Sequence, residues 1–258
     1  MFLIILTIIL ISLIFAPLGC ISLWKKYVYF GDGLAHASLL AGSISIICHF
    51  SVISSGVIVA ILFAILVFIL NNKAVGSSVV ILVSSFMLSL ALVISYLKPA
   101  QININNLLFG DILAASFNDI GILLLLLILV VSFIWYFYDQ ILLIVINKDI
   151  AKIKGINVRI IELVFLIFLS LAIFSTIKIV GSLLVTSILL IPAMTSRLIS
   201  RTPGRMIINA AIISLAINFI GLISSFHFDI PLTPIITLIN TIIYSLIYSI
   251  SYVKKILL

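Results

Sequence analysis

Residues 120–131 read Ile-Gly-Ile-Leu-Leu-Leu-Leu-Leu-Ile-Leu-Val-Val, and apolar runs of this kind recur along the whole chain. Hydrophobic residues make up 65% of the 258 residues and charged residues only 8%, whereas a soluble domain carries about 25% charged residues. A membrane-spanning helix needs about 20 apolar residues. The strands of a membrane barrel would alternate polar and apolar residues, which these runs do not do. The sequence therefore predicts an all-α fold, a polytopic bundle of transmembrane helices whose backbone hydrogen bonds close within each helix.

Nine apolar segments are expected to cross the membrane, with boundaries good to about two to four residues. They cover residues 2–23, 29–49, 52–70, 76–97, 119–138, 160–177, 180–195, 206–225 and 232–252. Losing or gaining one span would give eight or ten crossings. The sequence has no internal repeat, no Pro- or Ser-rich linker and no soluble domain. Residues 1–258 are therefore expected to form a single transmembrane domain.

The positive charges predict the orientation of these spans. With the N-terminus outside, the inner segments hold twelve Lys and Arg residues and the outer segments only Lys98 and Lys178. This distribution follows the positive-inside rule, so the net charge of +7 points to the membrane lipid and not to nucleic acid. Residues 98–118 begin polar and end in a short apolar stretch, which favours a surface or re-entrant helix on the outer face.

Asp32 and His36 are the polar pair that stands out in this apolar sequence, within Tyr29-Phe30-Gly31-Asp32-Gly33-Leu34-Ala35-His36-Ala37-Ser38. Residues four apart share one face of a helix, where a carboxylate and an imidazole can bind a transition-metal ion. The structural alternative is an Asp at the helix start and a His that bonds to a neighbouring helix. The small residues around the pair would let a second copy of the chain approach closely. Two Asp and two His would then form a four-ligand site suited to Zn²⁺ or Mn²⁺.

Other ionisable residues near the expected outer face have a structural interpretation beside a functional one. Cys48 and His49 could act as soft metal ligands, although a buried thiol beside an interfacial imidazole is the commoner situation. His227, in the last outer loop, could contact an incoming ion or lie in solvent. Asp111 and Asp119 could attract cations, and Asp119 could equally begin the helix that follows it.

Three further residues have structural explanations, and the absence of several sequence motifs argues against an enzyme. Glu162 and Lys178 lie near the two ends of one expected span, where snorkelling explains both, and Pro192 should kink or end its helix. The chain has no G-x-x-x-x-G-K-[ST], H-E-x-x-H or G-x-S-x-G motif. It is therefore not expected to be an enzyme or to bind ATP in a P-loop. An intramembrane metalloenzyme would need a third ligand and a base near Asp32 and His36.

The inner segment 193–206 is basic. Arg197 and Arg201 are four residues apart and share a helical face, and Pro203-Gly204 is expected to end that helix. A basic helix on this side is suited to docking a cytoplasmic partner, and equally to anchoring at lipid headgroups.

Three segments of the chain resemble the bacterial zinc/manganese ABC-transporter permeases. They are Tyr29–Leu40, Leu108–Leu113 and Ile179–Ala193, and their order and spacing hold across essentially the whole chain. Within that family the similarity is greatest to the permeases of high-affinity zinc uptake systems. The resemblance implies a permease in the bacterial inner membrane that works as a homodimer. Its implied partners are a dimer of ATP-binding cytoplasmic subunits and a periplasmic metal-binding protein.

The resemblance also implies roles for individual residues. Asp32 and His36 match the positions on the metal pathway, and the segment from Thr195 to Arg205 matches the helix that couples to the ATPase. The coupling residues expected there are Thr195, Ser196, Arg197, Arg201 and Arg205. No resident cofactor is implied, because the metal, Zn²⁺ or alternatively Mn²⁺ or iron, is the transported substrate. Gly33 departs from the relatives, which often have Thr or Ala at that position.

Two further functions from other classes are weighed against this interpretation. A secondary metal transporter without an ATPase would be favoured by inverted repeats and by more intramembrane carboxylates, and the sequence has neither. A purely structural membrane subunit would tolerate the loss of both Asp32 and His36.

Overall fold

The computed structural model describes residues 2–71, 76–97, 110, 115–182 and 184–256. Within these residues the chain is helical and contains no strand. The helices are α1 (Phe2–Trp24), α2 (Phe30–Cys48), α3 (Val52–Leu70), α4 (Gly76–Leu97), α6 (Phe117–Ile146), α7 (Lys148–Ile153), α8 (Val158–Val180), α9 (Val185–Ile199), α10 (Pro203–Phe228) and α11 (Leu232–Ile256). Most of the segment 98–118, including Asp111, lies outside the described residues.

Each of the nine expected spans is a helix, which confirms the all-α fold. Seven of the described helices are long and apolar enough to cross a membrane. The two expected spans that are not among these seven are α2, with 19 residues, and α9, with 15 residues. At a rise of about 1.5 Å per residue α9 is about 22 Å long, shorter than a hydrocarbon core of about 30 Å. It begins at Val185, five residues later than expected, and continues through Pro192 to Ile199, so the helix does not end at the proline.

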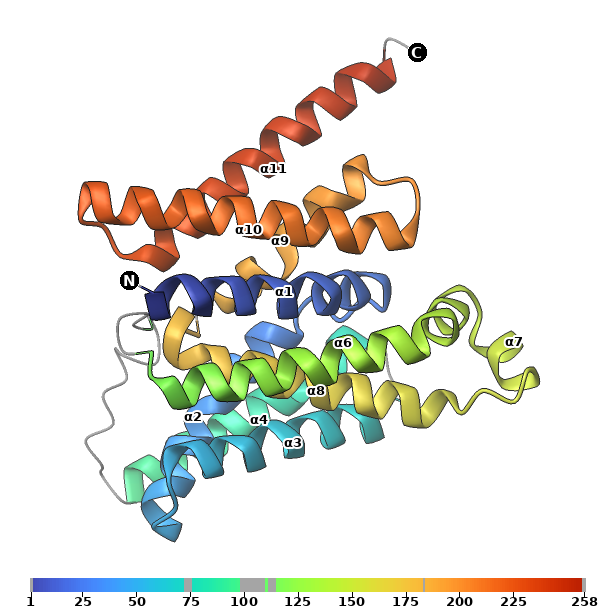
Figure 1. Ribbon diagram of the computed structural model, residues 1–258. Helices are drawn as coiled ribbons and strands as arrows, with labels where there is room; N and C mark the ends of the chain where they lie inside the picture. The colour runs from blue at the N-terminus through green and yellow to red at the C-terminus, as the bar shows by residue number, and fades with distance from the viewer. Residues whose placement is uncertain (1, 72–75, 98–109, 111–114, 183, 257–258) are drawn as a thin grey trace.

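α1 lies at the centre of the bundle, with α6 and α8 on one side and α9 and α10 on the other (Figure 1). Of its most apolar window 72% is buried, the largest share among the membrane-length helices described. α2 and α3 pack against α8, and α4 packs against α2 and α3. The C-terminal part of α11 projects away from the bundle (Figure 1). Gly19 brings α1 against α9, because a side chain there would collide with the carbonyl oxygen of Leu189.

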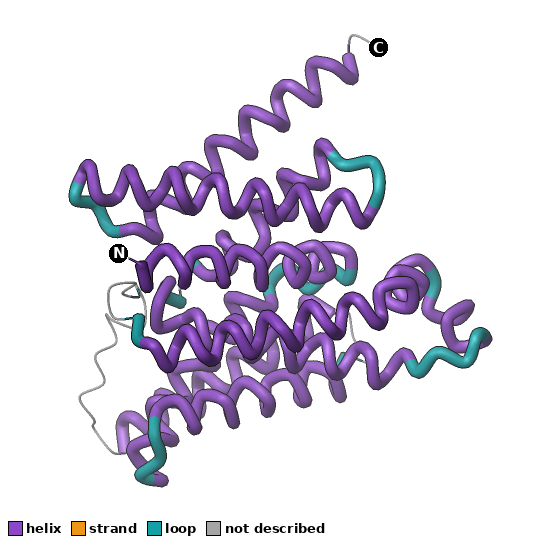
Figure 2. Tube along the Cα trace, viewed as in Figure 1, coloured by secondary structure: helices purple, strands orange, loops and turns teal. Residues whose placement is uncertain are grey.

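The two ends of the bundle differ in charge. Figures 1 and 2 show the segment 147–157 and the loop 200–202 at one end, called here the basic end. The turns 49–51 and 229–231 lie at the opposite end together with the N-terminus. The loop 25–29 also lies at the basic end, where Lys25 forms an ion pair with Glu162 near the start of α8. This arrangement agrees with the orientation that the positive charges predict.

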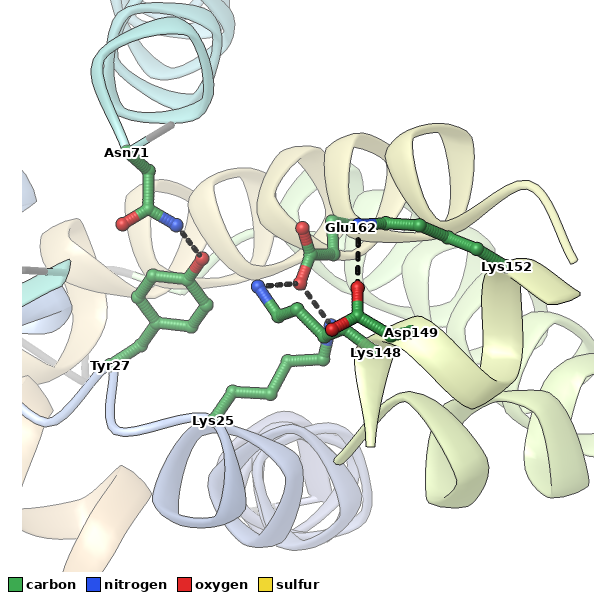
Figure 3. A network of polar contacts seen from close by, with 7 residues as sticks. All are labelled: Lys25, Tyr27, Asn71, Lys148, Asp149, Lys152 and Glu162. Carbon is green, nitrogen blue, oxygen red and sulfur yellow. Dashed lines mark hydrogen bonds and ion pairs between the residues drawn. The ribbon is translucent and has the colours of Figure 1, made fainter. Parts of the chain in front are cut away.

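A network of polar side chains ties the α1–α2 loop to α8 at the basic end (Figure 3). Glu162 Oε1 lies 3.2 Å from Lys25 Nζ and 2.9 Å from Lys148 Nζ. The side chains of Lys25 and Glu162 are only 5% and 12% exposed. Burial lowers the pKa of Lys25, and the negative charge of Glu162 opposes that shift. Glu162 is thus a buried counter-charge, and the prediction that snorkelling explains it is wrong.

Tyr27 fixes the same loop from its other side. Its hydroxyl accepts a hydrogen bond of 2.8 Å from Asn71 Nδ2 (Figure 3), and its ring lies 6.4 Å from that of Phe165. Burial raises the pKa of Tyr27, and the negative charge of Glu162 adds to the shift. The phenol therefore stays protonated and acts in packing and hydrogen bonding.

Asp119 lies in the first turn of α6 and forms a capping box with Ser116, the N-cap. The Asp119 carboxylate accepts from the backbone N–H and hydroxyl of Ser116, and Ser116 Oγ accepts in return from the Asp119 N–H. Lys178 Nζ lies 2.9 Å from Asp119 Oδ2, so this lysine is paired instead of snorkelling. The structure confirms the helix-start interpretation of Asp119.

Glu162→Gln should lower the thermal stability of the purified protein far more than Asp149→Asn. The first change leaves the Lys25 ammonium buried without a counter-charge, and breaking a buried pair costs about 3–5 kcal/mol. The second breaks the exposed Asp149–Lys152 pair, of the kind worth about 0–1 kcal/mol. The measurement is the unfolding midpoint of both variants in detergent.

The destabilisation by Glu162→Gln should shrink as the pH is raised. Burial lowers the pKa of Lys25, so its amine becomes neutral at a lower pH than an exposed lysine and no longer needs the carboxylate. Equal midpoints for the two variants at neutral pH would contradict the structural role given to Glu162.

Candidate metal site

Asp32 and His36 lie in the first turns of α2 and face the same way. Both are exposed on the surface of the single chain, together with Tyr29 at the N-cap of α2. Asp32 and His36 line a cavity of about 310 Å³ between α2 and α4. The other residues that line it are Tyr29, Gly33, Val80, Ile81, Ser84, Ser85 and Leu88. The structure therefore brings the two predicted ligands to one hollow surface.

The opposite face of α2 explains why the pair points outward. Phe30, Leu34 and Ala37 share that face and are fully buried. Phe30 packs edge-on against Phe63, with ring centroids 5.1 Å apart. Burying the large apolar residues leaves the carboxylate and the imidazole to face the cavity. Gly33 lets α4 approach, because a Cβ there would lie 2.7 Å from Val80 Cγ1.

Asp32 has a hydrogen-bond partner on α9. Thr186 Oγ1 donates to Asp32 Oδ1 at 2.5 Å. Gly31 makes this approach possible, because a Cβ at that position would lie 2.6 Å from Thr186 Oγ1. A hydrogen bond from a neutral donor to a carboxylate is among the stronger kinds in proteins. The bond occupies one carboxylate oxygen and fixes the direction of the other.

The position of the pair relative to the basic end follows from its contact with α9. Thr186 lies 13 residues before Ile199, which adjoins the loop 200–202 at the basic end. At a rise of about 1.5 Å per residue this separation is about 20 Å along the axis of α9. The pair therefore contacts the end of α9 that is remote from the loop 200–202. Ionisable groups within a bundle of membrane-spanning helices usually serve ion or substrate pathways.

One chain brings two candidate ligands to this place. Among the described residues there is no cluster of three or more His, Cys, Asp or Glu side chains that could hold a metal ion. His49 is the left-handed C-cap of α2, about 20 Å from His36 along the helix axis, and is exposed. An intramembrane metalloenzyme built within one chain therefore has no third ligand in the described part of the protein.

The remaining outer-face candidates lie apart from the cavity. His227 is exposed in the last turn of α10, and Asp229 is the left-handed C-cap of that helix. Asp111 falls outside the described residues. Sequence reasoning did not single out Thr186, Ser84 or Ser85, because a neutral hydroxyl gives no signal in an apolar span. The segment Ile179–Ala193, which was noted for its resemblance, does contain Thr186.

The basic segment is built from the end of α9, a short loop and the start of α10. Arg197 lies on α9, Arg201 in the loop and Arg205 in the first turn of α10, and all three are exposed. Thr195 and Ser196 are fully buried. Of the five predicted coupling residues, the three arginines are therefore the ones on the surface.

Pro203 begins α10, and the prediction that it ends the preceding helix is wrong. α9 ends at Ile199, and Thr202 caps α10 by accepting from the Arg205 N–H. Proline is favoured in the first turn of a helix because its missing N–H would have no intrahelical partner there. Arg197 and Arg201 consequently do not share a helical face.

Ser196 holds the turn between α9 and α10 in place from inside. Its hydroxyl donates to the carbonyl oxygen of Met206 at 2.7 Å. Asn209 Nδ2 donates to Ser200 Oγ at 2.9 Å, which adds a second link across the turn. These bonds fix the geometry in which the three arginines are displayed.

The sequence matches the ABC 3 transport family over residues 1–251. It is 34% identical over 227 residues to the high-affinity zinc uptake system membrane protein ZnuB of Haemophilus influenzae, covering 87% of each chain. It is 32% identical over 253 residues to the protein of the same name in Buchnera aphidicola subsp. Baizongia pistaciae, covering 96% of this chain and 95% of that one. The fold is similar to a solved chain of PsaBC from Streptococcus pneumoniae in complex with Fab, with a TM-score of 0.81 and 21% identity, over 95% of this chain and 89% of that one.

Proposed function

Because this chain belongs to the ABC 3 transport family, we propose that it is the membrane-spanning permease subunit of an ATP-binding-cassette importer for a divalent transition metal, with Zn²⁺ as the preferred substrate. The observation that carries this proposal is the exposed Asp32–His36 pair in a cavity between two apolar helices, α2 and α4. The 32–34% identity to two zinc uptake permeases over most of the chain supports the choice of metal.

The donor set is suited to the transport of such an ion. One carboxylate oxygen and one imidazole nitrogen per chain are ligands that Zn²⁺ accepts, and Mn²⁺ accepts them as well. Manganese and iron are therefore the alternative substrates. A transport site must bind the ion strongly enough to replace part of its hydration shell and weakly enough to release it.

Two copies of the chain would complete the site. Both ligands are exposed on the single chain, and four donors are the usual number for zinc in a closed site. Pairing two copies along the face of α2 and α4 would bring two carboxylates and two imidazoles together around one ion. It would also shield from lipid the polar side chains that the single chain leaves exposed.

The energy for transport would come from ATP hydrolysed by partner subunits. A periplasmic metal-binding protein delivers the ion at the outer end, and a pair of ATP-binding subunits docks at the basic end. Arg197, Arg201 and Arg205 form the docking surface for those subunits, and the buried Thr195 and Ser196 keep its shape. Nucleotide binding and hydrolysis then bias the permease between an outward-open and an inward-open state. The permease itself carries out no chemical conversion.

Asp32→Asn and His36→Ala should each abolish metal uptake while the complex still assembles. Either change removes a ligand from both copies, so the ion loses two of its four protein donors. The measurement is zinc uptake in cells that carry this permease and its partners as their sole zinc importer. His49→Ala, on the same helix but remote from the cavity, is the matched control and should transport normally. Normal uptake by both site variants would overturn the assignment of the metal site.

Charge reversal at Arg197 and Arg201 should uncouple the permease from its ATPase. The reversed surface would repel a partner that recognises the arginines, so ATP hydrolysis stimulated by the permease should fall along with transport. Lys154→Glu, also exposed at the basic end, serves as the control. The docking assignment fails if the doubly reversed protein still binds the ATPase and transports at the rate of the control.

A further inference from the structure

α9 joins the metal site to the surface at the basic end. Near its first residue, Thr186 donates to the carboxylate of Asp32. Near its last residue, Arg197 is exposed and Ser196 bonds to the start of α10. A single helix of 15 residues therefore contacts a metal ligand at one end and carries part of the proposed docking surface at the other.

The contact between α9 and α2 is close. Gly31 presents no side chain to α9, and any Cβ there would press on Thr186. Thr186 is half-buried, and its hydroxyl is bonded to the carboxylate of the exposed Asp32. A small displacement of α9 along or away from α2 would lengthen this hydrogen bond, which weakens steeply as its geometry departs from the ideal.

We propose that Thr186 is a positioning residue that sets the metal affinity of Asp32 according to the position of α9. This inference rests on the proposed transport function. With the hydroxyl bonded to Oδ1, the carboxylate is held in one orientation, and the site has its higher affinity for the ion. When the cytoplasmic partner shifts α9, the bond is lost, the carboxylate is free to rotate, and the affinity falls.

This role for Thr186 rests on how hydrogen-bond partners affect the side chains that bind a metal. A hydrogen bond to a ligating carboxylate fixes its direction, and removing such a partner typically lowers metal affinity about 10- to 100-fold. A transporter needs its site to differ in affinity between two states, because a partner can only shift an equilibrium through differential interactions. A bond between a ligand and a movable helix provides such a difference.

Thr186→Val tests this inference, because valine keeps the shape of threonine and removes the hydroxyl. Zn²⁺ binding is measured on the permease–ATPase complex in lipid nanodiscs, once without nucleotide and once with a non-hydrolysable ATP analogue. In the wild type the two affinities should differ. In Thr186→Val the higher affinity should fall about 10- to 100-fold, and the difference between the two states should largely disappear.

Two further variants separate positioning from packing. Thr186→Ser retains the hydroxyl and should keep both the affinity and its nucleotide dependence. Ser187→Ala removes the neighbouring hydroxyl of α9 and should behave like the wild type. The ATPase rate of every complex is measured in parallel to show that it is assembled.

The outcomes distinguish this inference from the function on which it rests. If Asp32→Asn abolishes zinc uptake but Thr186→Val retains wild-type affinities in both states, the site stands and the positioning role is refuted. If Thr186→Ser is as defective as Thr186→Val, the effect is one of packing and the inference is again refuted. Zinc uptake that survives Asp32→Asn would instead refute the transport site itself.

Discussion

A carboxylate inside a hydrocarbon core must find its partners within the protein, and this constraint governs the architecture around Asp32. Its bond to Thr186 requires α9 to begin beside the first turn of α2, and Thr186 is the second residue of α9. It also requires a neighbour without a side chain, which Gly31 provides. The apolar residues on the other face of α2 are buried, so the carboxylate and the imidazole of His36 are left to face a cavity.

A second set of charges anchors the chain just before this site. Lys25 and Glu162 hold the α1–α2 loop against α8, and Tyr27 bonds to the end of α3. The start of α2 is thus fixed from the basic end by the buried Lys25–Glu162 pair and the Asn71–Tyr27 hydrogen bond, and from the side by Thr186. Such double anchoring holds the first turns of α2, and with them the two candidate metal ligands, in a fixed position relative to the rest of the bundle. It also connects the site, through α9, with the surface that displays the arginines.

Much of this fold could be predicted because a helix in lipid is specified by local sequence. Long apolar runs placed every expected span, and the four-residue spacing of Asp32 and His36 placed both on one face. Pairings between distant segments could not be predicted in the same way. Glu162 and Lys25 are 137 residues apart in sequence, and Lys178 and Asp119 are 59 apart, so snorkelling was the simpler local explanation for Glu162 and Lys178. Pro203 was misinterpreted because a proline is compatible with the end of one helix and with the first turn of the next.

The central claim is that two copies of the chain share one ion between the Asp32 and His36 side chains of each. The most direct test is the ratio of bound Zn²⁺ to permease chains in the purified complex, measured together with the donor atoms by X-ray absorption spectroscopy. The account predicts one ion for every two chains, surrounded by nitrogen and oxygen donors only. One ion per chain, or sulfur among its ligands, would contradict it.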